Sequence, residues 1–332
     1  MRPSLLIASI QAMVKVGRSV YVAGKPGNGK STICHTAVRG IEGGSWGYRE
    51  IHGPTMLVED MGILFPNKTD DKLSYRLADW WPIEGECEEQ GVLCFDDRDK
   101  CDINLQKVIA NIQQARHLHG HKLPDGWSVI ATGNRLEDRS GSARLLGHLA
   151  NRETQITLEA NLPDFSAWGL DNGVNPILLA YLQMRPDQLH DYDPNREQNP
   201  SPRSWVEGVS NLIGIVPAEA QFEVFKGSVG EGAAAEFTGF MKIWRDLPSI
   251  ESILRSPDTA DVPSEGPVLY ALAGAIAEAA TIANFDGLIR YVNRLPKEFG
   301  AITVSFAARK NVDLTDTKAF NKWAVVNHDL LF

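Results

Sequence analysis

The sequence feature that most constrains this chain is the run YVAGKPGNGKS at residues 21–31. Gly24 to Ser31 match the pattern GxxxxGK followed by Ser or Thr, which chance produces in roughly one chain of this length in a hundred. The preceding SVYVAG is typical of a buried strand, and the following STICHTAV can begin a helix. At such a turn, Gly27 and Gly29 let successive backbone N–H groups point inward, where the helix N-terminus favours an anion.

This turn predicts a phosphate-binding loop, with a flexible surface turn as the alternative interpretation. Lys30 would reach the outer phosphates of ATP, and the Ser31 hydroxyl would complete the coordination of Mg²⁺. We expect the nucleotide to contact the whole loop and the start of the helix, namely Gly24, Lys25, Pro26, Gly27, Asn28, Gly29, Lys30, Ser31 and Thr32.

A second motif, GVLCFDD, should supply acidic groups to the same site. Val92 to Phe95 form a continuous apolar run, and Asp96 and Asp97 follow at its carboxyl end, where open α/β sheets bind their ligands. Asp96 would bind Mg²⁺ through water, and Asp97 would orient or deprotonate the attacking water. The alternative is that DDRDKCD is a solvated loop that caps the next helix.

The pattern continues as an alternation of strands and helices from about Val20 to Leu158, which predicts an α/β fold with a mainly parallel sheet. Asn134 stands at the tip of the buried strand WSVIATGN, where its amide could touch both the water and the γ-phosphate. Asn at a strand end is also a common turn former, so both interpretations stay open. From Asn161 onward, the apolar spacing predicts amphipathic helices.

Length and charge narrow the class of protein. The 332 residues are enough for about two domains, and a formal net charge of −9 disfavours stable binding to nucleic acid unless a local basic patch exists. The apolar stretch from Val268 to Phe285 carries Glu278 and is too short and too polar to span a membrane, so we expect a buried helix. Four cysteines without a CxxC pair favour a cytoplasmic location.

Taken in order, GKPGNGKS, VLCFDD, ATGNR, HLANR and SPRSW resemble the motifs of AAA+ ATPases of the MoxR type, found in bacteria and phages. The resemblance extends from Tyr21 to Trp205 and is weaker beyond about residue 215. It implies a P-loop AAA+ core followed by a small helical lid. We expect the core at residues 1–160, the lid at 161–250 and, from the apolar spacing beyond it, a C-terminal helical extension at 251–332. It also implies a homo-oligomeric ring, often a hexamer, with ATP at each subunit boundary.

Position by position, the resemblance assigns Walker A to Lys30 and Ser31, Walker B to Asp96 and Asp97, and the first sensor to Asn134. One departure matters, because the family usually has Glu where this chain has Asp97. A carboxylate shortened by one methylene could misplace its water, and a misplacement of about 1 Å can cost about a hundredfold in rate.

Two arginines receive roles from the resemblance. Arg152, just before the strand TQITLE, matches the arginine finger that enters a neighbour's ATP site, and Arg203 in SPRSW matches the second sensor. Arg139 and Arg144 compete for the finger role. Each assigned arginine could instead form a surface salt bridge.

Two segments inserted into the core should face the substrate. Residues 52–86 match the insert that lines the ring face in MoxR relatives, and RHLHGHKLPDG resembles the hairpin before the first sensor strand. Trp80 and Trp81 in the first segment would either grip a client protein or anchor the packing.

The leading hypothesis is therefore an ATP-hydrolysing ring that remodels or activates a protein partner. The resemblance implies a partner with a von Willebrand factor A domain. A nucleic-acid motor or restriction-type NTPase is the first alternative, and a monomeric P-loop kinase is the second.

Overall fold

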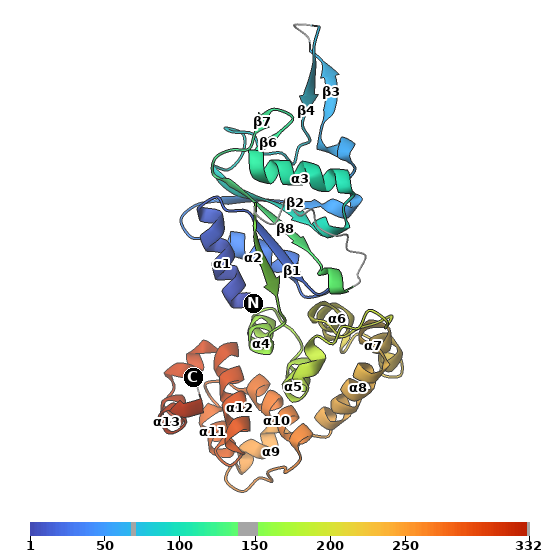
Figure 1. Cartoon of the computed structure of the whole chain (residues 1–332). Helices are drawn as coiled ribbons and strands as arrows, with labels where there is room; N and C mark the ends of the chain where they lie inside the picture. Colours follow the sequence, from blue (N-terminus) through green and yellow to red (C-terminus); the bar gives the residue numbers. More distant parts are fainter. Residues whose placement is uncertain (68–70, 139–151, 331–332) are drawn as a thin grey trace. The chain divides into compact units, whose positions relative to one another are not determined.

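The structure is a computed structural model that describes residues 1–67, 71–138 and 152–330 (Figure 1). It divides into two compact units, Met1–Ala160 and Asn161–Phe332. Among the described residues, no helix is both long and apolar enough to cross a bilayer.

The first unit is built on a five-stranded sheet whose strands all run parallel. Its strand order is β2-β5-β8-β1-β9, with bounds of Trp46–His52 for β2, Gln90–Asp96 for β5, Trp127–Gly133 for β8, Val20–Gly24 for β1 and Thr154–Leu158 for β9. β8, which Asn134 follows, therefore lies between the strand before the P-loop and the strand that carries Asp96. All three strands present their carboxyl ends at one edge.

Helices cover both faces of this sheet, as Figure 1 shows. α1 (Pro3–Lys15) and α2 (Lys30–Arg39) pack on one face, and α3 (Ile103–Ala115) packs on the other. The pleat explains this, because successive side chains point to opposite faces. Val20 and Val22 belong to the core beneath α1 and α2, whereas Tyr21 belongs to the core beneath α3.

Two hairpins extend the α3 side of the unit. β3 (Ile63–Pro66) pairs with β4 (Leu73–Arg76), and β6 (His117–Leu118) pairs with β7 (His121–Lys122), both antiparallel. The rings of Tyr75 and His119 stack with centroids 3.7 Å apart and so join the two hairpins. The fully packed Trp81 is a core anchor, whereas Trp80 is half-buried and meets Phe95 edge to face.

The second unit is helical, with bounds of Leu162–Asp171 for α4, Pro176–Met184 for α5, Pro202–Gly208 for α6, Gln221–Val229 for α7, Glu231–Arg245 for α8, Ile250–Arg255 for α9, Gly266–Ala279 for α10, Phe285–Val292 for α11, Lys297–Lys310 for α12 and Lys318–Val326 for α13. α10 packs against α5, α8 and α12. The proposed division between lid and extension at residue 250 stays a prediction.

The apolar stretch from Val268 to Phe285 is a correction to the sequence analysis, because it is not one helix. α10 ends at Ala279, and α11 begins at Phe285 after a break in which Asn284 Nδ2 donates to the Ala279 carbonyl. The predicted fold class is confirmed: a P-loop α/β core with a mainly parallel sheet flanked by helices, followed by further helices.

Candidate nucleotide-binding site

The glycine-rich run forms the turn between β1 and α2. Gly27 and Gly29 adopt φ values of 74° and 75°, in the left-handed region that glycine tolerates best. Gly29 is the N-cap of α2, so the helix begins at Lys30 and directs its first free N–H groups into the loop. This geometry is an anion-binding turn at a helix N-terminus.

Lys30 is 8% exposed and folds back over the loop. Its Nζ donates to Asn134 Oδ1 at 2.8 Å and to the carbonyls of Gly24 at 3.1 Å and Lys25 at 3.2 Å. Burial lowers the pKa of Lys30, while the nearby carboxylates, Asp97 foremost, oppose that shift. Walker A and the first sensor are thus in direct contact through one hydrogen bond.

The two predicted metal ligands also meet. Ser31 Oγ donates to Asp96 Oδ1, which accepts a second hydrogen bond from Thr132 Oγ1. Hydroxyl and carboxylate oxygens are the donors that Mg²⁺ prefers, with waters and phosphate oxygens completing its octahedron. Among the described residues, no group of three or more His, Cys, Asp or Glu side chains is arranged to hold a metal ion. The hydroxyl of Ser31 and the carboxylate of Asp96 are oxygen ligands of the kind that Mg²⁺ takes.

Thr132 is a site residue that the sequence analysis missed. Besides its bond to Asp96, its Oγ1 accepts a hydrogen bond from the backbone N–H of Asp97 at 3.0 Å. It therefore ties the β8 strand to both Walker B positions. A usable signal existed, because Thr132 lies two residues before Asn134 in a strand that otherwise is apolar or small.

Asp97 leaves the strand in a strained conformation. Its φ of 50° and ψ of 40° lie in the left-handed region, which is uncommon for a residue with a side chain. Lys100 Nζ lies 2.7 Å from Asp97 Oδ2. The preceding residue, Asp96, has a different neighbour, because its Oδ2 lies 3.7 Å from His52 Nδ1. The candidate base is thus paired with a lysine from the same turn, and its role stays a prediction.

The arginines differ in where the structure places them. Arg152 is half-buried. Arg152 lies two residues before Thr154, and Thr154 pairs with Val20 at the start of β1. The P-loop begins at Gly24, at the other end of β1. Val20 and Gly24 are four residues apart along the strand, which corresponds to about 13 Å at about 3.3 Å per residue. Arg152 therefore lies toward the opposite edge of the sheet from its own P-loop.

The remaining arginines are less informative. Arg203 is exposed on α6 in the second unit, two residues after the N-cap Ser201, and its assignment as the second sensor stays a prediction. Arg139 and Arg144, the alternatives for the finger, lie outside the residues that the structure describes.

A cluster around Arg98, which the sequence analysis also missed, adjoins the site. Arg98 follows Asp97 in the short helix η3 (Arg98–Lys100), and its side chain is fully buried. It forms two hydrogen bonds to Glu153, at 2.7 and 2.8 Å, and its guanidinium carbon lies 4.4 Å from the Tyr21 ring centroid. No local sequence pattern predicts this pair, because its partners are 55 residues apart.

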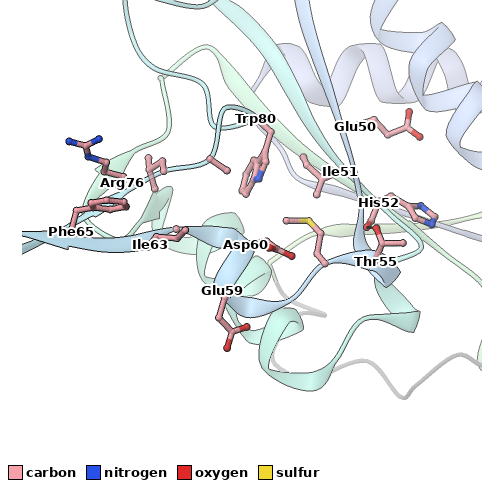
Figure 2. Close-up of a pocket in the computed structure, with 14 residues that line it drawn as sticks. Glu50, Ile51, His52, Thr55, Glu59, Asp60, Ile63, Phe65, Arg76 and Trp80 are labelled. Atoms are coloured by element: carbon pink, nitrogen blue, oxygen red, sulfur yellow. Dashed lines mark hydrogen bonds between the residues drawn. The ribbon is translucent and has the colours of Figure 1, made fainter.

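A cavity of about 620 Å³ opens beside the Walker B edge (Figure 2). It lies between β2 with η1 (Gly53–Thr55) on one side and the β3–β4 hairpin on the other, with Trp80 between them, and η2 (Val58–Met61) contributes to its wall. Its lining residues are Glu50, Ile51, His52, Thr55, Met56, Glu59, Asp60, Gly62, Ile63, Phe65, Arg76, Leu77, Ala78 and Trp80. The lining is mixed: apolar side chains alternate with three carboxylates, a histidine and a threonine, and its one arginine lies over the Phe65 ring.

The known proteins to which this chain is similar are only distantly so. No family model matches the chain, and no curated protein matches it. Solved structures with a similar fold include NtrX from Brucella abortus in complex with ATP, at 10% identity and a TM-score of 0.42, covering 99% of this chain and 68% of that one. A RuvB mutant from Thermotoga maritima is 14% identical with a TM-score of 0.39, covering 85% of this chain and 82% of that one.

Similarities this distant carry no argument about function, which has to rest on the site itself. The sheet order, the left-handed glycines of the loop and the convergence of Lys30, Asn134 and Asp96 at one edge define a P-loop fold with a candidate nucleotide-binding site.

Proposed function

We propose that this chain is a Mg²⁺-dependent ATPase that works as a homo-oligomeric ring, taken as a hexamer, and remodels or activates a protein partner. The observation that carries the ATPase proposal is the hydrogen bond from Lys30 Nζ to Asn134 Oδ1 beside the Ser31–Asp96 pair. These four side chains come from three separate elements and converge at the carboxyl edge of the sheet, where ligands of α/β proteins bind.

Each side chain has a distinct chemical task. The loop N–H groups and the Lys30 ammonium hold the phosphates, and Asn134 orients the attacking water. Ser31 and Asp96 would hold Mg²⁺, and the bound ion would supply positive charge against the charge that develops on the phosphates. Asp97 accepts the proton from water, and its Oδ1 is the available oxygen because Lys100 pairs with Oδ2.

The position of Arg152 supports the ring. A guanidinium near the opposite edge of the sheet cannot serve its own P-loop about 13 Å away along the strand, but it can face the pocket of a neighbouring subunit. A cation supplied in trans stabilises charge on the transferred phosphoryl group. This placement supports the proposal that ATP binds at the subunit boundary.

The cavity supports a protein partner. It starts at β2, whose His52 lies 3.7 Å from Asp96, and continues along the β3–β4 hairpin. The hairpin exposes large apolar side chains, Ile63 at 60%, Leu64 at 48%, Phe65 at 41% and Leu73 at 61%. Exposed apolar groups gathered on one element favour a binding surface. A protein with a von Willebrand factor A domain is the partner class that we propose, following the MoxR resemblance.

Mixing two variants tests the ATPase and the ring together. An acceptor subunit carrying Arg152→Ala keeps its own pocket but lacks the finger, whereas a donor subunit carrying Lys30→Ala has a dead pocket and an intact finger. Each alone should be inactive, and the acceptor should still bind ATP. Their mixture should regain turnover, because an arginine finger contributes about 10³ to 10⁵ in rate and a surface salt bridge contributes almost nothing.

The alternatives predict other outcomes. Normal turnover by the acceptor alone, or no recovery although the two variants co-assemble, would exclude the trans role of Arg152. A monomeric mass with bound ATP would favour a small-molecule kinase. DNA binding that weakens steeply with salt would favour a nucleic-acid motor, because counterion release is its signature.

A further inference from the structure

The Arg98–Glu153 pair connects the two segments that carry the proposed catalytic residues Asp97 and Arg152. Arg98 directly follows Asp97, and Glu153 directly follows Arg152. Both side chains are completely buried, and their two parallel N–H···O bonds fix the planes of the guanidinium and the carboxylate relative to one another. One rigid contact therefore links the Walker B turn to the residue beside the finger.

A third side chain locks this contact against α3. Gln113 accepts a hydrogen bond from Arg98 Nη1 at 3.2 Å and donates one to Glu153 Oε2 at 2.9 Å. On the other side, the Arg98 guanidinium lies over the Tyr21 ring. The backbone is fixed as well, since Thr154 N donates to the Ser19 carbonyl and Cys101 N donates to the Arg98 carbonyl.

Stability alone does not account for such a pair. Taking two charges out of water costs several kcal/mol each in general, and apolar side chains of similar volume often serve as well or better. A further buried polar group beside the pair is unsatisfied, because both Asp99 oxygens lack a hydrogen-bond partner among the described residues. The fold therefore contains a buried ion pair that costs desolvation free energy, and its two members are the residues that follow Asp97 and Arg152.

We propose that the Arg98–Glu153 pair is a positioning element that sets Arg152 for the neighbouring subunit's ATP site. This inference rests on the proposed function, in which Arg152 acts in trans. Arg98 and Glu153 touch no substrate, and they act by holding the backbone of residues 152 and 153 against the Walker B turn. A movement of the Asp97 turn in one subunit is then transmitted to the finger that serves the next.

The test uses the donor subunit defined above, because its own pocket is dead. Replacing Arg98→Met and Glu153→Met together in the donor removes both charges and keeps comparable volume. In such a donor, any effect on its own Walker B site is silent, so turnover in the mixture reports only how well its Arg152 serves the acceptor. The original donor, with the pair intact, is the matched control.

We expect the double change to lower the thermal midpoint of the donor less than either single change does, since only Gln113 is left without its two partners. Co-assembly should stay unchanged, and the recovered turnover should fall at least tenfold. The reason is that a misplacement of about 1 Å can cost about a hundredfold. Either single change should lower the midpoint by roughly 10 °C, because it leaves an unpaired buried charge. Recovery within twofold of the control would overturn the inference.

The two proposals fail in different ways. No recovery with the original donor contradicts the trans role of Arg152, whereas recovery that is insensitive to the double change contradicts only the positioning role. Should the double variant not fold, Arg98→Lys in the donor gives the same test. Lysine keeps the charge but loses the paired N–H bonds, so recovered turnover should fall, and full recovery would overturn the inference.

Discussion

Tyr21→Phe should stabilise the first unit, although it removes a polar group from the centre of the sheet. The Tyr21 ring belongs to the core beneath α3, and the residue is 3% exposed. Its hydroxyl has no hydrogen-bond partner among the described residues. Burial raises the pKa of this hydroxyl, and the Asp99 carboxylate raises it further, so the group stays neutral and unsatisfied.

The magnitude follows from the cost of a buried, unpaired hydroxyl. Such a group costs about 1–3 kcal/mol relative to water, and phenylalanine keeps the ring face on which the Arg98 guanidinium lies. A gain of about 1 kcal/mol should raise the thermal midpoint by about 2–4 °C for a unit of this size. The assay is thermal and denaturant unfolding of both proteins under identical conditions.

Tyr291→Phe is the matched control, because it makes the same chemical change at a satisfied hydroxyl. Tyr291 Oη donates to the Asp261 carbonyl at 2.6 Å, and the residue is fully buried. Its loss should cost about 1 kcal/mol. A Tyr21→Phe protein destabilised as much as Tyr291→Phe would refute the reasoning, since the Tyr21 hydroxyl would then have a buried partner such as an ordered water.

Three further predictions concern other parts of the first unit. Asp97→Glu should retain or raise ATP turnover, since it restores the longer carboxylate of most MoxR relatives, and a large loss with normal ATP binding would show a site built for the shorter acid. Iodoacetamide at pH 8 should label the half-buried Cys87 before Cys101, as peptide mapping by mass spectrometry would show. The reason is that burial raises the pKa of Cys101 to about 11, which leaves about one Cys101 thiol in a thousand ionised at pH 8. Gly91→Ala should destabilise by about 1–3 kcal/mol in denaturant titrations, because its Cβ would lie 2.6 Å from the Trp127 ring.

The sequence by itself determined the local elements of the nucleotide site. The β-branched run before Gly24, the glycines of the loop and the apolar run before Asp96 each act over a few residues, so composition and periodicity are enough to predict a strand, a turn and a helix start. The parallel sheet also followed, because strands and helices alternate along the chain. The extent of the helix proposed from Val268 was wrong, since a buried apolar stretch does not show where the backbone breaks.

Only the tertiary structure decided which of these side chains meet. The strand order places β8 between β1 and β5, and this puts Asn134 on Lys30 and Thr132 on Asp96. Arg98 and Glu153 read as ordinary surface charges in the sequence, yet the fold buries both. Strand order and burial depend on the free energy of packing the whole sheet against its helices, which no local window of sequence contains.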